Sequence, residues 1–130
     1  MIKILNTLEI SDIPEIKEIL SGVGTLVDVS TNRGSIFNHL SDTDVYLSSA
    51  AVQVDREFID KAKHLKLIAS PSTGTDHLDI DYIKKKNIKL FEISKEINLL
   101  NQFTATSELT FGLILNLKRR IIEASNSAKN

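Results

Sequence analysis

Residues 65–79 read Leu65-Lys66-Leu67-Ile68-Ala69-Ser70-Pro71-Ser72-Thr73-Gly74-Thr75-Asp76-His77-Leu78-Asp79. The apolar run at the start is typical of a buried strand, and Asp79 is placed to cap a helix that begins near Ile80. The small, hydroxyl-rich turn between them presents backbone N–H groups at the carboxyl end of a strand. Open α/β sheets bind ligands at that edge, and unpaired amides attract anions. This stretch therefore predicts a strand–turn–helix unit with a candidate anion site.

The same alternation of short apolar runs and amphipathic segments covers residues 1–92. Strands are expected at 2–5, 25–29, 44–48, 66–70 and 88–92. Five strands separated by helices indicate an α/β fold, with a parallel sheet and helices on both faces. Among the topologies that right-handed crossovers allow, the flavodoxin-like strand order 2-1-3-4-5 is the first choice.

Local signals predict where the helices begin and end. We expect Ser11 or Asp12 to cap the first helix, Pro14 to lie in its first turn, and Gly22 and Gly24 to end it. Its apolar stripe is Ile13, Ile16, Ile19 and Leu20. A weaker helix is expected at 35–40. Asp55 caps another, with Phe58, Ile59 and Ala62 facing inward, and the helix capped by Asp79 ends at Asn87, which tolerates the left-handed conformation.

The C-terminal part departs from this rhythm. One long helix is predicted from about Thr104 to Ala124, followed by a polar tail, residues 125–130. Its apolar residues form more than one stripe, so it requires burial on more than one side: Leu109, Phe111, Leu113, Ile114, Leu115, Leu117, Ile121 and Ile122. The pattern calls for a further strand that does not follow, which indicates a truncated protein.

Composition excludes several classes of function. The formal net charge is -1, without a basic half, so the charge pattern of a nucleic-acid-binding protein is missing. The basic clusters 84–86 and 118–120 suit the C-terminal ends of helices. No cysteine is present, and His39 and His64 lack partners at metal-ligand spacing, so we expect no metal site. Apolar stretches are too short to span a bilayer, and no signal pattern appears, so a cytoplasmic location without a membrane partner is expected.

Two motifs resemble one known family. Leu65–Ala69 running into Ser72–Asp79 resembles the signature turn of the D-isomer-specific 2-hydroxyacid dehydrogenases (phosphoglycerate dehydrogenase-like). Residues 104–115, Thr-Ala-Thr-Ser-Glu-Leu-Thr-Phe-Gly-Leu-Ile-Leu, resemble the interdomain helix of these enzymes. The resemblance is strongest from Val45 to Ile122.

The resemblance implies a two-domain, NAD-dependent oxidoreductase that transfers a hydride to or from C2 of a small 2-hydroxy or 2-oxo acid. Residues 1–100 would be its substrate domain, and 101–124 the helix that leads to an absent Rossmann domain. The family's catalytic Arg, Glu and His lie in or beyond that domain, so this chain would hold no catalytic residue and be inactive alone. The choice between NAD and NADP, and the identity of the acid, stay open.

The resemblance also implies which residues contact ligands. Thr73 and Gly74 would offer N–H groups to the substrate carboxylate, and Thr73 would also lie beside the nicotinamide. Ser72 would add a hydroxyl, and Gly74 would permit close approach and a positive φ. Ser49, after the third strand, would be a further substrate contact. No cation stands nearby before Arg56, which disfavours a phosphorylated substrate.

The other polar residues of the turn are interpreted as structural. Asp76 is expected to bond backbone N–H groups of its own turn, and His77 to be a structural or surface residue. A hydrolase triad of Ser72, His77 and Asp76 is disfavoured because three near neighbours on one turn do not align as nucleophile, base and orienter.

Two alternatives remain open at this point. One is a non-catalytic flavodoxin-like binding or regulatory module, although the ends of the first and third strands lack the residues of a receiver or a flavin site. The other is a corepressor-like relative that uses the dehydrogenase fold to bind a partner. We also expect the apolar helix from Thr104 to dock on a second copy, as a homodimer, or to fold back on its own domain.

Overall fold

The computed structural model describes residues 1–128. The chain divides into two compact units, the first formed by Met1–Lys95 and the second beginning at Glu96. The candidate turn of residues 70–79 lies in the first.

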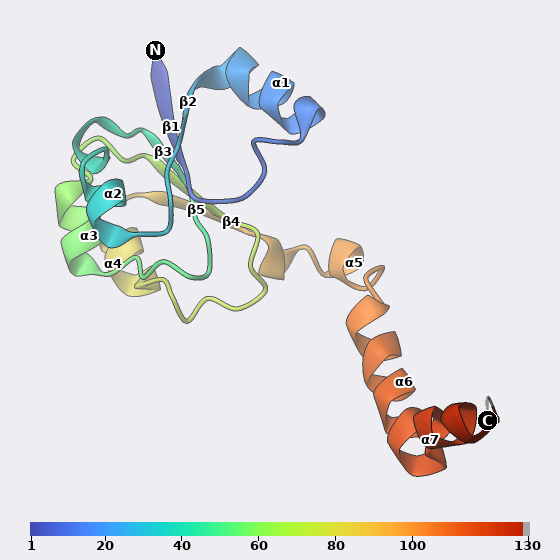
Figure 1. Ribbon diagram of the computed structural model, residues 1–130. Helices are drawn as coiled ribbons and strands as arrows, with labels where there is room; N and C mark the ends of the chain where they lie inside the picture. The colour runs from blue at the N-terminus through green and yellow to red at the C-terminus, as the bar shows by residue number, and fades with distance from the viewer. Residues whose placement is uncertain (129–130) are drawn as a thin grey trace. The chain divides into compact units, whose positions relative to one another are not determined.

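The first unit is built on a five-stranded parallel sheet (Figure 1). Its strands are β1 (Ile2–Asn6), β2 (Gly24–Asp28), β3 (Val45–Leu47), β4 (Leu67–Ser70) and β5 (Lys89–Glu92). The order is β2-β1-β3-β4-β5, and every neighbouring pair is parallel. The predicted fold class and strand order are confirmed.

The helices of this unit are α1 (Pro14–Val23), α2 (Arg33–Phe37), α3 (Arg56–Lys61) and α4 (Ile80–Lys85), with 3-10 turns at Leu40–Asp42 and Ile93–Lys95. Asp55 and Asp79 cap α3 and α4, accepting the N–H groups of Phe58 at 2.9 Å and Tyr82 at 3.1 Å. Asn87 has a φ of 58°, as its place after α4 predicted.

The start of α1 differs from the prediction. Its N-cap is Ile13, without a side-chain hydrogen bond to the helix. The hydroxyl of Ser11 instead donates to Asp28 at the end of β2. Pro14 does occupy the first turn, where a preset φ favours the helix. The apolar stripe predicted for this helix is not buried in the structure: α1 buries none of its residues, and Ile19 is 68% exposed.

Gly24 ends α1 and begins β2, and it lies against the neighbouring strand. A Cβ at this position would stand 2.3 Å from the carbonyl oxygen of Ile2, its partner in the β1–β2 register. No side chain fits at that distance. Gly22, by contrast, lies within α1 with open space around it.

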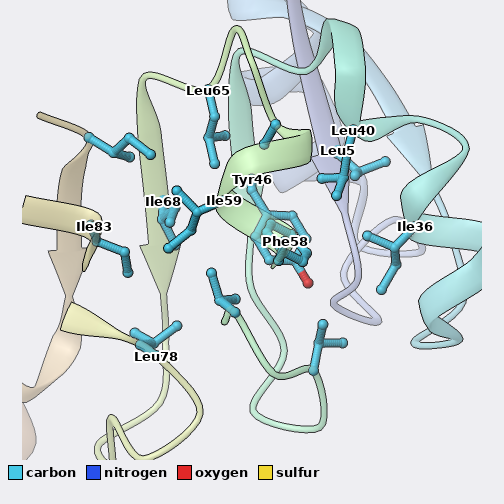
Figure 2. Packing of buried hydrophobic residues seen from close by; sticks show 14 residues of the cluster. Leu5, Ile36, Leu40, Tyr46, Phe58, Ile59, Leu65, Ile68, Leu78 and Ile83 are labelled. Carbon is cyan, nitrogen blue, oxygen red and sulfur yellow. The ribbon is translucent and has the colours of Figure 1, made fainter. Parts of the chain in front are cut away.

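The core fills the space between one face of the sheet and α2, α3 and α4 (Figure 2). Leu5, Tyr46 and Ile68 form a row across β1, β3 and β4, because each is paired with the next in the strand register. Phe58 of α3 packs on this row, with its ring centroid 4.9 Å from that of Tyr46. This packing holds the carboxyl ends of β3 and β4, and so the loops that follow them, in a defined position.

The second unit contains α5 (Ile97–Leu100), α6 (Ala105–Arg119) and α7 (Ile121–Ala128). The single long helix predicted here is interrupted at Arg120, which adopts the left-handed conformation (φ 48°, ψ 44°). The side chain of Asn116 accepts the Ile122 N–H at 3.3 Å, which gives the backbone a partner outside the helical ladder.

The predicted polar tail is partly helical as well. Residues 125–128 belong to α7, and residues 129 and 130 lie outside the described part of the chain. The apolar side chains expected to need a partner are exposed, among them Phe111 at 68% and Leu117 at 81%.

Candidate functional site

Two loops meet at the carboxyl edge of the sheet. The loop after β3 begins at Ser48, and the turn after β4 begins at Pro71. The strands before them are paired in register, and the Ser48 N–H donates to the carbonyl of Ala69 at 2.8 Å. The loops therefore leave the sheet side by side, as expected where adjacent parallel strands end.

A short bridge joins the two loops again further on. Val54 and Leu78 form an isolated parallel β-bridge. The Val54 N–H donates to the carbonyl of His77 at 2.8 Å, and the Asp79 N–H donates to the carbonyl of Val54 at 3.1 Å. The loops are thus tied at their beginning by the sheet and at their end by this bridge.

Between these ties lies an open pocket of about 550 Å³. Ala50 and Gln53 line it from the first loop. The second loop contributes Pro71, Ser72, Thr73, Gly74, Asp76 and His77. Three of the four predicted substrate contacts, Ser72, Thr73 and Gly74, therefore come together on one wall. Ser49 lies in the first loop outside the lining, where its hydroxyl accepts the Ala51 N–H at 3.3 Å.

The amides of the turn differ in their hydrogen bonding. The Ser72 N–H donates to the hydroxyl of Ser70 at 3.4 Å. Within residues 1–128, the N–H groups of Thr73 and Gly74 donate to no protein acceptor, and both residues are exposed. Two adjacent residues of the pocket lining therefore carry N–H groups without a protein acceptor, and an anion site requires such free donors.

Gly74 does not need a left-handed backbone. The structure has no glycine with positive φ among the described residues, so the expected positive φ at Gly74 is wrong. A Cβ here would contact only the Asp76 carboxylate, at 3.8 Å, an ordinary van der Waals distance. Gly74 also lines the pocket, and the close approach of a ligand to its backbone stays a prediction.

Asp76 and His77 occupy different environments on the pocket wall. Asp76 is exposed, and in the described chain its carboxylate makes none of the turn hydrogen bonds predicted for it. His77 is buried, with 5% of its surface exposed, and its Nε2 lies 3.4 Å from Ser70 Oγ. Burial lowers the pKa of His77, and the nearby Asp76 carboxylate opposes that shift in part.

A buried hydroxyl pair fixes the start of the first loop. Thr7 Oγ1 lies 3.0 Å from the Tyr46 hydroxyl, donates to the carbonyl of Leu47 at 2.9 Å and accepts the Ser49 N–H at 3.0 Å. Burial raises the pKa of Tyr46 to about 12, so its hydroxyl stays protonated at neutral pH. Sequence reasoning missed Thr7 because these partners lie about 40 residues further along the chain.

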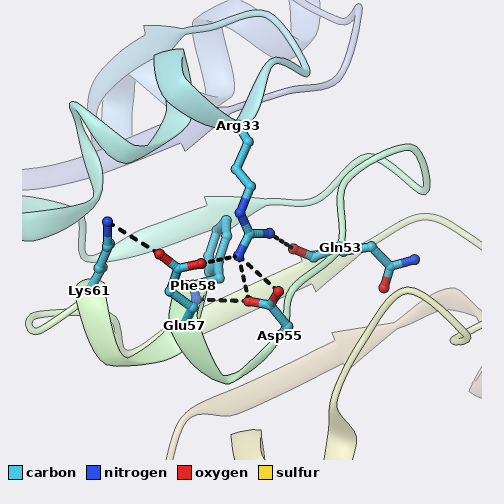
Figure 3. Close-up of polar contacts among 6 residues, drawn as sticks. All are labelled: Arg33, Gln53, Asp55, Glu57, Phe58 and Lys61. Atoms are coloured by element: carbon cyan, nitrogen blue, oxygen red, sulfur yellow. Dashed lines mark hydrogen bonds and ion pairs between the residues drawn. The ribbon is translucent and has the colours of Figure 1, made fainter.

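Arg33 anchors the end of the same loop (Figure 3). Its Nη2 lies 2.8 Å from both carboxylate oxygens of Asp55 and 3.1 Å from Glu57, and its Nη1 donates to the carbonyl of Gln53 at 3.3 Å. The guanidinium also stacks 4.6 Å from the ring centroid of Phe37. Arg33 holds the pKa of the Asp55 carboxyl below its usual value. The sequence pattern carried no signal for this long-range contact.

The described residues form neither a metal-binding cluster nor a membrane-spanning helix. No group of three or more His, Cys, Asp or Glu side chains in residues 1–128 is arranged to hold a metal ion. No helix in the same range is long and apolar enough to cross a membrane.

Comparison with known sequences identifies relatives. The model of the family described as D-isomer specific 2-hydroxyacid dehydrogenase, catalytic domain, matches residues 3–97. A protein of Staphylococcus saprophyticus named as a putative 2-hydroxyacid dehydrogenase is 34% identical over 117 residues, covering 85% of this chain and 35% of that protein. One of the same name from Staphylococcus haemolyticus is 31% identical over 98 residues, covering 75% and 29%. The chain thus spans about a third of the length of these relatives.

A solved structure has the same fold over nearly the whole chain. D-lactate dehydrogenase of Aquifex aeolicus, determined in complex with NAD and lactic acid, aligns with a TM-score of 0.74 and 26% identity, over 98% of this chain and 37% of that one. The family match, the relatives and this shared fold agree with the motifs of residues 65–79. The chain therefore belongs to the D-isomer-specific 2-hydroxyacid dehydrogenases, and residues 3–97 correspond to the catalytic domain of that family.

Proposed function

We propose that this chain supplies the carboxylate-binding half of an enzyme that transfers a hydride between NAD(H) and C2 of a small 2-hydroxy or 2-oxo acid. The observation that carries the proposal is the pair of unpartnered N–H groups of Thr73 and Gly74 on the wall of the pocket. Membership of the dehydrogenase family supplies the reaction class.

The proposed roles follow from the chemistry of a carboxylate. The Thr73 and Gly74 amides donate to its oxygens, and hydrogen bonds to an ionised acceptor are about twice as strong as neutral ones. Ser72 lines the same wall and brings a hydroxyl as a third polar group. Ser49 lies outside the lining, so a contact from it to the substrate is the least supported of the proposed roles. Holding the carboxylate fixes C2 relative to the cofactor, which is the positioning that hydride transfer needs.

The residues of this chain do not fit the pyrophosphate of a dinucleotide. Gly22-Val23-Gly24 lies at the end of α1 and the start of β2, so it is not a turn from a strand into a helix. Thr73 is the single cofactor contact proposed for this chain. NAD is the proposed cofactor, as in the Aquifex complex, and the residues of this chain do not discriminate it from NADP.

The lining of the pocket also bears on the substrate. Asp76 is the charged side chain among the lining residues of the described chain, and its carboxylate would repel a second anionic group. This supports the expectation that the substrate is not phosphorylated. A small monocarboxylate such as pyruvate or D-lactate is therefore a suitable probe.

The proposal is tested by nuclear magnetic resonance (NMR) titration of the 15N-labelled chain with pyruvate and, as a neutral isostere, pyruvamide. Pyruvate is expected to shift the amide signals of Thr73 and Gly74, whereas pyruvamide leaves them in place. Gly74→Ala should weaken the response, because a methyl group narrows the approach to the turn. Gly22→Ala is the matched control, since its added Cβ meets open space in α1. Equal responses to the two compounds would contradict the proposal.

A further inference from the structure

His77 is a buried titratable residue on the pocket wall to which the proposed function gives no role. Its main chain is held by the bridge to Val54, and its Nε2 lies 3.4 Å from Ser70 Oγ. Burial and these contacts fix the position of its ring.

The Nδ1 atom of His77 is accessible and unpartnered. In the described chain Nδ1 takes part in no hydrogen bond, and no buried side-chain nitrogen or oxygen lacks a partner. Nδ1 therefore reaches solvent, although only 5% of the residue is exposed. His77 lines the same pocket as Thr73 and Gly74, so the pocket is the space in which an accessible Nδ1 can meet a ligand.

The hydrogen bonds of Ser70 determine which ring nitrogen carries the proton. The Ser72 backbone N–H is only a donor, so Ser70 Oγ accepts from it. Ser70 is buried, and within residues 1–128 its hydroxyl hydrogen has no acceptor other than His77 Nε2, so we assign the Ser70 hydroxyl as the donor to Nε2. A neutral imidazole that accepts at Nε2 carries its hydrogen on Nδ1. The order of donors is thus Ser72 N–H, Ser70 O–H and His77 Nδ1–H.

We infer that His77 is a ligand-binding residue of this pocket, which donates a hydrogen bond from Nδ1 to an oxygen of the bound 2-oxo or 2-hydroxy acid, with Ser70 as the positioning residue that sets its tautomer. The inference rests on the proposed function, since it assigns a third donor to the same substrate. The third donor is a side chain, so His77 can be substituted without removing the N–H groups of Thr73 and Gly74.

Burial supports a neutral donor at this place. The pKa of His77 is lowered by burial, and Asp76 is the charged group that opposes the shift. At neutral pH the ring donates without carrying a charge of its own. A hydrogen bond from a neutral imidazole depends on the direction of the acceptor, so it would select the geometry of the ligand. The attraction of a cation for an anion depends much less on direction.

The first test requires no variant. The 15N chemical shifts of the His77 ring identify which nitrogen is protonated, and the expected result in the free chain at neutral pH is hydrogen on Nδ1. Addition of pyruvate is expected to move the Nδ1 signal together with the amides of Thr73 and Gly74. Hydrogen on Nε2 would overturn the inference.

Two substitutions separate the ring nitrogens. The carboxamide nitrogen of His77→Asn approximates the position of Nδ1, and that of His77→Gln approximates Nε2. If Nδ1 contacts the ligand, His77→Gln should raise the dissociation constant of pyruvate by about threefold to tenfold, the usual contribution of one hydrogen bond. His77→Asn should retain more affinity than His77→Gln. Ser70→Ala should weaken binding less than His77→Gln. It removes the hydroxyl that sets the tautomer of His77, but it leaves Nδ1 in place.

The outcomes distinguish this inference from the proposed function. If pyruvate shifts Thr73 and Gly74 but His77→Gln binds as tightly as the unaltered chain, only the role of His77 fails. If pyruvate shifts neither the amides nor the ring, both fail. The wild-type ring measurement decides the question if a variant does not fold, which its amide spectrum would reveal.

Discussion

Val54 and Leu78 pair as an isolated bridge and bring together two loops that the sequence separates by more than twenty residues. The bridge is flanked on one side by the cap of α3, Asp55, and on the other by the cap of α4, Asp79. The pocket wall at Thr73 and Gly74 is therefore framed by β4 at one end and by the start of a helix at the other. Because both ends of the loop are fixed, the loop does not refold to give the Thr73 and Gly74 N–H groups a protein acceptor.

Asp55 has two separable roles, as the cap of α3 and as the partner of Arg33. Asp55→Ala should lower the free energy of unfolding by about 0.5–2 kcal/mol through loss of the cap. Arg33→Ala should cost less, about 0.2–1 kcal/mol, because both side chains are partly exposed and the ion pair is screened. Urea denaturation checks both values. Asp55→Asn is the control, since it keeps a cap oxygen and removes the charge. A larger decrease in the free energy of unfolding for Asp55→Asn than for Asp55→Ala would contradict the assignment of two separate roles to Asp55.

Gly24→Ala should destabilise the edge of the sheet. The new Cβ would stand 2.3 Å from the Ile2 carbonyl oxygen, so β1 and β2 must separate at their start. Overpacking of this kind costs about 1–3 kcal/mol. Gly22→Ala, two residues earlier in α1, should be neutral or stabilising, because alanine favours helix and meets open space. Comparable melting temperatures for the two variants would show that β1 and β2 accommodate the added Cβ without a loss of stability.

The stability of the chain should fall between pH 7 and pH 5 in a manner that depends on His77. Burial lowers the pKa of His77 in the folded state from the ordinary value of 6.5. As the pH drops below that value, the unfolded chain binds a proton that the folded chain does not, so unfolding becomes more favourable. Denaturation of the unaltered chain and of His77→Gln across this range measures the effect. Parallel curves for the two proteins would exclude His77 as the source.

The second unit should associate through its apolar helices. Leu117 is 81% exposed and Phe111 68% exposed, with further apolar residues on the same helix α6. Surfaces of this type usually bind another copy or another part of a protein. Sedimentation should show a dimer at micromolar concentration, and Leu117→Glu should shift it toward monomer. A chain that stays monomeric at all concentrations would leave the predicted homodimer without support.

The chain alone should neither bind NAD nor transfer a hydride. It has no glycine-rich turn between a strand and a helix for a dinucleotide pyrophosphate, and Thr73 is its one proposed contact to the cofactor. Calorimetry with NAD is expected to give no heat above dilution, with or without pyruvate. Micromolar binding of NAD would require a dinucleotide site that the sequence motifs do not reveal.

Local signals predicted most of the first unit correctly. Strand positions followed from short apolar runs, and the caps at Asp55 and Asp79 from acidic residues before helical patterns, because each involves contacts within a few residues. The cap of α1 was wrong because the hydroxyl of Ser11 is used by Asp28, seventeen residues away. The break at Arg120 was missed because arginine gives no signal for a left-handed backbone. The Ile122 N–H donates to the side chain of Asn116, six residues earlier, and this spacing is not one that a helical pattern reveals.

The sequence by itself determined the fold class, the strand order and the family, and it predicted Ser72, Thr73 and Gly74 as substrate contacts. Strand periodicity and the motif of residues 65–79 are local properties, so they can be read without coordinates. Only the tertiary structure decided that the Thr73 and Gly74 amides are unpartnered, that Ser49 lies outside the pocket and that His77 is buried against Ser70. Those features depend on the register between β3 and β4 and on the bridge between their loops, which bring together residues far apart in the chain.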